Sequence, residues 1–164
     1  QRCGTSMKTP NNSHHPNGTT NQILKKNLNF AIKAKLWLER SYKKCSEIDF
    51  NKEISPDEMD SLEGLTSRFA RLADILIHKV FRSIEAAELE IPGTIIDTVN
   101  RISKRGLIES SDQIRNLKDL RNTISLEYEE DQLVLLMKEV LEKTPELIQI
   151  LDNTLQYCQS KNYI

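Results

Sequence analysis

Apolar residues recur at steps of three, four or seven along most of this chain, a period that predicts α-helices. No stretch alternates apolar and polar residues as a β-strand would. The predicted helices cover residues 21–45, 55–90 and 94–104, a fourth that opens at Ser110 or Ser111, and a last that follows the acidic cluster from Glu127 to Asp131. We therefore predict an all-α fold, an antiparallel up-and-down bundle of four long helices plus one short helix.

Local signals mark the start of the first two helices. Thr20 precedes the first apolar-periodic stretch and is the expected N-cap. Ser55 and Glu58 have the spacing of a capping box, and Pro56 suits the first helical position because its missing N–H has no partner there anyway. The second helix should therefore begin at Pro56.

Two further signals concern helix ends. Gly106 predicts a left-handed C-cap, and Leu107 and Ile108 after it should form a hydrophobic clasp. Pro145 interrupts the apolar pattern of the last helix, because proline lacks an N–H and clashes with the preceding turn. We expect a kink there, or a restart of the helix capped by Thr144.

The second predicted helix has an unusually broad apolar face. Its apolar positions are Leu62, Leu65, Phe69, Leu72, Ala73, Leu76, Ile77, Val80, Phe81 and Ile84. A face this wide should contact more than one neighbour, either inside the bundle or across a dimer.

Composition sets the class of protein. The chain has 164 residues, which suits one domain, and its formal net charge is −1, so any nucleic-acid contact needs a local basic patch. Residues 1–19 are polar and aperiodic and are predicted to form a loose tail, which leaves residues 20–160 as the helical domain. Adjacent His14 and His15 in the tail lack a partner ligand at helical spacing and are interpreted as solvated loop residues.

One local basic patch is present on the outer face of the first predicted helix. Its cations are Lys25, Lys26, Lys33, Lys35, Arg40, Lys43 and Lys44, and Glu39 is the one acid among them. Such a face can bind RNA, or it can simply be solvated, and the sequence leaves both interpretations open.

Cysteine usage and hydropathy indicate a cytoplasmic protein without a membrane segment. Cys3, Cys45 and Cys158 are far apart and follow no metal-binding spacing, so neither a zinc site nor a disulfide framework is expected. No apolar run approaches the roughly 20 residues of a membrane span, and the N-terminal residues lack a signal-peptide core. We expect no metal and no cofactor.

The most specific pattern lies between Gly106 and Tyr128. A Gly-Leu-Ile turn is followed by Arg121 and Asn122, with Tyr128 six residues after the asparagine. This pattern resembles the HEPN superfamily, in particular the HepT-like proteins and the nucleotidyltransferase substrate-binding proteins. Their motif reads Arg-Asn-x-x-x-His-x-Tyr, and Leu126 occupies the histidine position here.

The resemblance implies a homodimer whose composite site, where two protomers meet, holds an RNA phosphodiester. It also implies a minimal nucleotidyltransferase as partner, and it assigns Tyr128 as the residue to which adenylate is attached. Arginine offers a fixed positive charge and a planar donor fork for phosphate, but it cannot act as a general base at neutral pH. The histidine would carry the proton, and Leu126 can neither accept nor donate one.

Two other residues are candidates for the missing proton carrier. His78 is the one histidine outside the tail, and it is either a relocated base or an ordinary helix histidine. Glu127 adjoins the lost position but should point about 100° away from Leu126.

Helical phase groups the motif residues further. If the helix stays regular, Arg121, Ser125 and Tyr128 share one face. Alternatively, Arg121 pairs with a carboxylate such as Asp119, and Tyr128 only packs.

Two functions from different classes follow. The first is a non-catalytic HEPN-type interaction module, in a toxin–antitoxin-like or substrate-binding role, that dimerises and binds a minimal nucleotidyltransferase. The second is a metal-independent endoribonuclease toxin that uses Arg121 and Asn122 with a noncanonical base.

Overall fold

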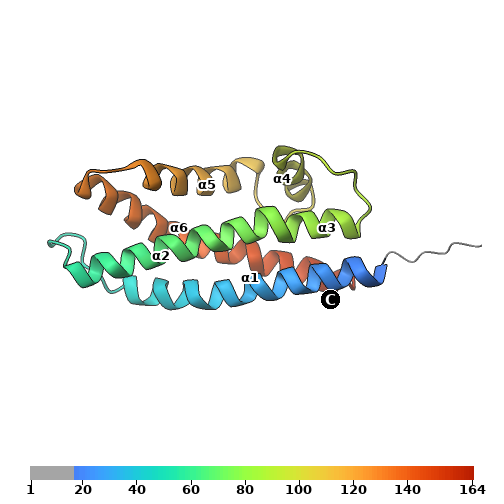
Figure 1. The fold of residues 1–164 in the computed structure, drawn as a ribbon, viewed down its shortest axis with the longest axis horizontal. Coiled ribbons are helices and arrows are strands. Elements are labelled where there is room, and N and C mark those ends of the chain that lie inside the picture. The colour runs from blue at the N-terminus through green and yellow to red at the C-terminus, as the bar shows by residue number, and fades with distance from the viewer. Residues whose placement is uncertain (1–16) are drawn as a thin grey trace, which may run out of the picture.

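A computed structural model describes residues 17–164, and all of its regular structure is helical. The all-α prediction is therefore confirmed, and no strand occurs between residues 17 and 164 (Figure 1). The elements in order are α1 (Asn17–Cys45), α2 (Pro56–Ile75), the π-helical turn η1 (Leu76–Val80), α3 (Phe81–Ala87), α4 (Ile95–Lys104), α5 (Ser111–Leu126) and α6 (Glu130–Ser160). No helix in this described range is long and apolar enough to cross a membrane.

Helices α2, η1 and α3 follow one another without a break and form one long rod. Helix α1 runs beside this rod in the opposite direction, and α6 lies against both (Figure 1). Helix α5 packs on α2 and α6, and the short α4 packs on α3, η1 and α5. The broad apolar face of the second predicted helix is therefore covered inside the chain by several neighbours, and it is not left free for self-association.

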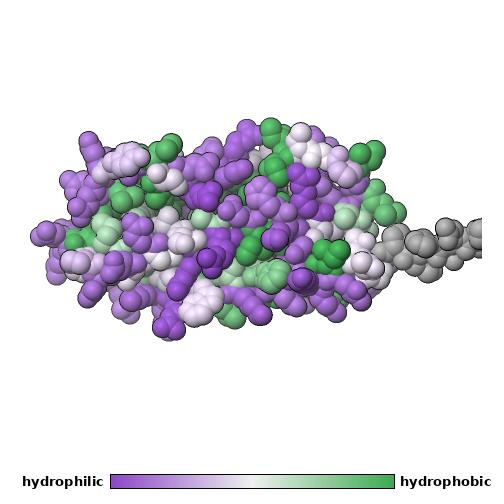
Figure 2. Space-filling model, viewed as in Figure 1, coloured by the Kyte–Doolittle hydropathy of each residue, from purple (hydrophilic) through white to green (hydrophobic). Residues whose placement is uncertain are grey.

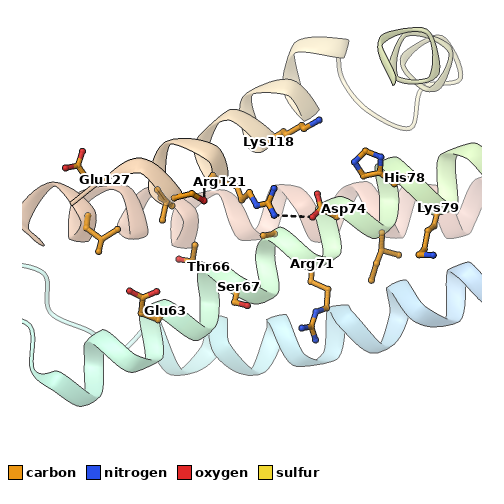
Figure 3. A pocket seen from close by; sticks show the side chains of 15 residues that line it. Glu63, Thr66, Ser67, Arg71, Asp74, His78, Lys79, Lys118, Arg121 and Glu127 are labelled. Carbon is orange, nitrogen blue, oxygen red and sulfur yellow. Dashed lines mark hydrogen bonds and ion pairs between the residues drawn. The ribbon is translucent and has the colours of Figure 1, made fainter. Parts of the chain in front are cut away.

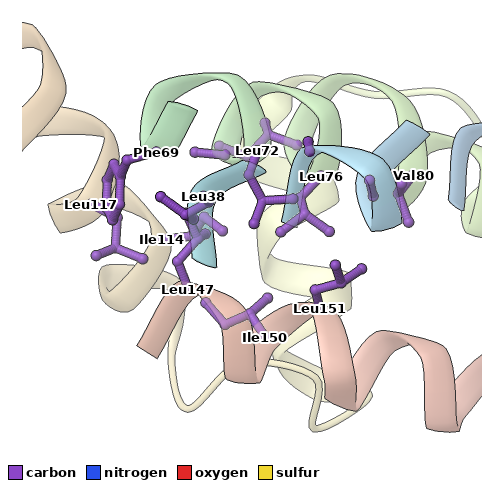
Figure 4. Packing of buried hydrophobic residues seen from close by; sticks show 14 of the residues in the cluster. Leu38, Phe69, Leu72, Leu76, Val80, Ile114, Leu117, Leu147, Ile150 and Leu151 are labelled. Atoms are coloured by element: carbon purple, nitrogen blue, oxygen red, sulfur yellow. The ribbon is translucent and has the colours of Figure 1, made fainter. Parts of the chain in front are cut away.

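The hydrophobic core lies where these helices meet. Figure 4 shows Leu38 of α1, Phe69, Leu72 and Leu76 of the central rod, and Leu147 and Leu151 of α6 converging on one another. Each of these six side chains is fully buried. Burying one leucine or phenylalanine side chain contributes about 1.5–3 kcal/mol, so the core holds the long helices in register.

The predicted start of the second helix is confirmed, and that of the first is wrong. The Ser55 side chain accepts a hydrogen bond from the Glu58 N–H and the Glu58 carboxylate accepts one from the Ser55 N–H, with Pro56 opening the helix. Helix α1 already begins at Asn17, so Thr20 lies inside it. The remaining predicted tail, including His14 and His15, lies outside the described residues.

The end of α4 behaves as the sequence predicts. Gly106 has φ +76°, and the N–H groups of Gly106 and Leu107 donate to the carbonyls of Ser103 and Ile102. Leu107 and Ile108 are buried behind the turn. This left-handed backbone conformation favours glycine, and the clasp turns the chain from α4 into α5.

Of the two outcomes expected at Pro145, a kink or a restart, the restart is wrong. Helix α6 continues through this residue to Ser160, and Thr144 is buried mid-helix with its hydroxyl donating to the Val140 carbonyl. Buried Val140, Leu147 and Thr144 keep the same helical spacing on both sides of the proline. Packing along this stripe outweighs the roughly 3 kcal/mol local cost of an interior proline.

Candidate functional site

An open groove of about 910 Å³ lies between α2 and α5. Its polar lining comprises Glu63, Thr66, Ser67, Arg71, Asp74, His78 and Lys79 from the central rod, Lys118, Arg121 and Ser125 from α5, and Glu127 just after α5. Figure 3 shows Arg121 of α5 and Asp74 of α2 extending toward one another between the two helices. The buried leucines of α2 lie on the other faces of this helix, so its polar residues in the groove face solvent.

Arg121 occupies the middle of this groove. Its Nη2 lies 3.5 Å from the Oδ2 of Asp74 on α2, and both side chains are 40% exposed (Figure 3). Arg121 therefore pairs with a carboxylate, as one of the two interpretations of the sequence holds, and that carboxylate is Asp74 rather than Asp119. A half-exposed ion pair of this kind contributes at most about 1 kcal/mol, so a ligand that offers a better acceptor can displace the carboxylate at small cost.

His78 lines the same groove and is exposed. It lies in η1, where the π-helical turn shifts the phase of the rod between α2 and α3. From the sequence, His78 was interpreted either as a relocated base or as an ordinary helix histidine. In the structure, it lines the same groove as Arg121. A neutral imidazole can accept a proton, so His78 is a candidate proton acceptor in the groove.

The groove is electrically asymmetric along its length. In Figure 3, Glu63 and Glu127 lie at one end, while His78, Lys79 and Lys118 lie toward the other, with the Arg121–Asp74 pair between them. Opposite charges gathered at separate ends create a local field even though the chain is nearly neutral. The end that holds Lys79 and Lys118 suits an anionic group such as a phosphate.

Asn122 does not join Arg121 in this groove. It lines a second, smaller hollow of about 290 Å³ between η1, α4 and α5, whose apolar wall includes Ile77, Val99 and Ile114. Adjacent helix residues diverge by about 100°, and this divergence separates the two motif side chains. Lys118 lines both hollows and is the residue they share.

The predicted Arg121–Ser125–Tyr128 face is wrong for Tyr128. Helix α5 ends at Leu126, and Glu127 is extended, with φ −89° and ψ 126°. The Glu127 carboxylate accepts a hydrogen bond from the Glu129 N–H and so stabilises the turn into α6. Ser125 stays in the groove and donates to the Arg121 carbonyl, but Tyr128 is 92% exposed and lies outside the groove lining.

Leu126 is also exposed, at 74% of its surface. The histidine position of the motif therefore faces solvent at the corner between α5 and α6. The assignment of adenylate attachment to Tyr128 stays a prediction, and its side chain is accessible for such a reaction.

Sequence analysis identified His78 but missed four polar residues that the structure places along the same face. Glu63, Ser67, Arg71, Asp74 and His78 follow one another at steps of three or four and form one polar stripe along the rod. The same helical period that predicts the apolar face of this helix also places these polar residues together on another face. Between residues 17 and 164, no cluster of three or more metal-ligating side chains occurs.

Comparison with protein-family models, curated proteins and solved structures found no match for this chain, so its function must be argued from its own residues.

Proposed function

We propose that this chain is a non-catalytic interaction module of the HEPN type that forms a homodimer and binds a minimal nucleotidyltransferase. The observation that carries the proposal is the state of the motif segment. Arg121 lies in an open groove, where a weak ion pair holds it, while the position of the proton carrier is an exposed leucine. Such a segment can hold an anion or a protein surface but lacks the histidine that RNA cleavage needs in the families it resembles.

The fold proposed for this function is the antiparallel up-and-down bundle of four long helices plus one short helix. Its long members are α1, the rod from α2 to α3, α5 and α6, and its short member is α4. In such a bundle, the corner between α5 and α6 is set by short connections and core packing, which gives a contact surface a fixed geometry.

The dimer contact is assigned to the corner formed by Leu126 and Tyr128. These are two of the most exposed large apolar side chains in the described part of the chain. Single exposed leucines are common on monomers. Here a leucine and a tyrosine, with one residue between them, form a small apolar protrusion at the end of a helix. Related by a two-fold axis, this protrusion would bring the two Arg121 grooves near one interface.

The oligomeric state tests this assignment. Light scattering after size exclusion should give a dimer for the wild type and a monomer for the double variant Leu126→Ser/Tyr128→Ser. Ile91→Ser is the matched control, because Ile91 is 77% exposed and lies in the loop before α4. A wild-type monomer, or equal dissociation by the control, would contradict the assigned contact.

The partner is tested separately. A minimal nucleotidyltransferase encoded beside this chain should co-purify with it, and the complex should persist in EDTA. Loss of the complex in Lys118→Glu/Arg121→Glu, with the isolated chain still folded by circular dichroism, would place the contact in the α2–α5 groove. A chain that is monomeric and retains no such enzyme would overturn the function.

The second candidate function is a metal-independent endoribonuclease, and the position of His78 favours it. The groove holds both a phosphate-binding arginine and an exposed imidazole, the two kinds of group that 2′-hydroxyl attack on a phosphodiester requires. Labelled RNA in EDTA should then be cut by the wild type but not by Arg121→Ala or His78→Ala. Equal background cleavage by all three proteins would exclude this function, and a gain of cleavage in Leu126→His would support the non-catalytic interpretation of the wild type.

A further inference from the structure

Helix α1 presents a regular outward stripe of cations and aromatic rings. Its members, here called the basic–aromatic stripe, are Lys26, Phe30, Lys33, Trp37, Arg40 and Lys44. They follow at steps of four, three, four, three and four, which places them along one face of the helix. All six are exposed, because Leu24, Leu28 and Leu38 occupy the opposite, buried face.

The charge of this helix differs from that of the rest of the chain. Helix α1 carries seven of the 23 lysine and arginine residues but only one of the 24 acidic residues, Glu39. The remaining chain is therefore acidic, and the positive field is concentrated on α1. At a rise of 1.5 Å per residue, the stripe extends over roughly 27 Å, which is long enough to follow several linked phosphates.

The aromatic rings are held in place by neighbouring cations. The Arg68 guanidinium of α2 lies 4.9 Å from the centroid of the Trp37 ring and is anchored by its hydrogen bond to the Ser41 hydroxyl at 2.7 Å. Lys26 lies 5.8 Å from the Phe30 centroid. Trp37 is nevertheless 54% exposed and Phe30 42% exposed, so each ring keeps surface available for a ligand.

A shallow hollow on α1 combines the two kinds of group. It has a volume of about 370 Å³ and is lined by Lys33, Leu36, Trp37 and Arg40. Leu36 and Trp37 supply an apolar floor, and the two cations stand at its rim. In Figure 2, pale and green side chains interrupt the purple ones along the part of the surface that covers α1.

We propose that the basic–aromatic stripe binds single-stranded nucleic acid, with bases against Trp37 and Phe30 and phosphates on the intervening cations. Proteins that bind single strands combine a cationic track with aromatic stacking platforms, and both are present here at one helical spacing. A duplex would not fit this pattern, because its bases are already stacked and paired. A membrane surface would require a continuous apolar face, and the apolar face of α1 is buried in the bundle.

Trp37 provides a direct test, because it is the one tryptophan in the chain. Titration with an oligo-dT strand of about 15 nucleotides should quench its fluorescence, and added NaCl should reverse the quenching. Absence of quenching at low salt would overturn the proposal. Quenching by phosphatidylserine vesicles with none by the oligonucleotide would also overturn it and assign the stripe to a membrane surface.

Variants then assign the binding to the stripe. By anisotropy of a labelled strand, Trp37→Ala should weaken binding between about fivefold and 150-fold, the range expected for loss of one stacked base. Lys33→Gln should lower the slope of log affinity against log salt by about 0.7, the value for one lost phosphate contact. Lys104→Gln at the end of α4 makes the same change off the stripe and should leave the slope unchanged.

The groove serves as the final control. If Arg121→Ala abolishes binding while Trp37→Ala and Lys33→Gln do not, the nucleic acid binds the groove and the stripe proposal fails. The proposal for the stripe and the proposal for the dimeric module can therefore be refuted independently of one another.

Discussion

Two arginines in this molecule are held in opposite ways. Arg105, at the end of α4, lies 2.6 Å from Glu88 and 2.9 Å from Glu90, and its side chain is 13% exposed. Arg121 has Asp74 as its one salt-bridge partner in the described chain, at 3.5 Å, and is 40% exposed. The guanidinium of Arg105 is occupied by carboxylates of its own chain. Arg121 retains N–H donors that a ligand can use.

The surroundings of Glu88 explain the first case. Its carboxylate accepts hydrogen bonds from Arg105 and from the hydroxyls of Tyr157 and Tyr163, and we call these four residues the Glu88 cluster. Burial, together with the hydrogen bond to Glu88, raises the pKa of Tyr157 to about 12, so the tyrosine remains a neutral donor. The cluster connects the end of α6 to the turn between α3 and α4. Within it, the charge of Glu88 is paired with that of Arg105.

The largest effect should follow from breaking this cluster. Glu88→Ala removes the acceptor of three donors, and we expect the free energy of unfolding to fall by about 2–3 kcal/mol. Hydrogen bonds to charged groups contribute about 1.5–3 kcal/mol each, and water that hydrates the freed donors offsets part of the loss. Urea unfolding followed by circular dichroism measures it. Asp74→Ala in the groove is the matched control and should cost less than about 1 kcal/mol. Equal losses would mean that the groove pair is as structural as the cluster.

A pH series should separate the two regions next. The pKa of Tyr157 is raised in the folded state, so its contribution to stability is complete below pH 10 and is lost as the pH rises toward about 12. Tyr157→Phe should be less stable than the wild type at pH 8 and should lose less stability between pH 10 and 12. Thermal midpoints at each pH give the comparison, and parallel profiles would show that Tyr157 does not titrate in this range. Cys158 stays in both proteins, so its raised pKa affects both profiles alike.

Sequence alone predicted the fold class and several helix ends, because these depend on local signals. The capping box at Ser55 and the left-handed turn at Gly106 are examples, since each uses residues within four positions of one another. The start of α1 was predicted wrongly, and at Pro145 the sequence left a kink and a restart of the helix both open. In α6, packing of distant helices overrides the local preference of proline, and a single sequence does not contain that contact information.

The candidate site was predicted only in part, for a related reason. The motif identified Arg121 and the helical phase added Ser125, and the structure places both in one groove. Asp74, which pairs with Arg121, and His78, which lines the same groove, lie more than 40 residues earlier in the chain, and no local pattern pairs the central rod with α5. Tyr128 was assigned to the wrong face because the prediction assumed a regular helix, whereas α5 ends two residues before it.

Double-mutant cycles should quantify the contrast between the two arginines. The coupling energy between Arg105 and Glu88 should be about 1.5–3 kcal/mol, the range for charge-assisted hydrogen bonds, because both side chains are largely buried. The coupling between Arg121 and Asp74 should lie below about 1 kcal/mol. Chemical unfolding of the four proteins in each cycle supplies both values. A groove coupling that matches or exceeds the cluster value would mean that Arg121 is not available to a ligand.

The smallest expected effect concerns the affinity of the groove itself. Asp74→Asn keeps the shape of the side chain but removes the charge that competes for Arg121, so inorganic phosphate should bind about twofold to fivefold more tightly, as expected for an exposed ion pair of up to 1 kcal/mol. The His78 imidazole resonances, followed by NMR during a phosphate titration, report binding from inside the groove. Glu63→Gln removes the same charge at the acidic end and should change the affinity less, because Glu63 is not within ion-pair distance of Arg121. If Asp74→Asn instead weakens binding, the carboxylate orients Arg121 for the anion and does not compete with it, and the groove would then resemble the Glu88 cluster in how it uses its charges.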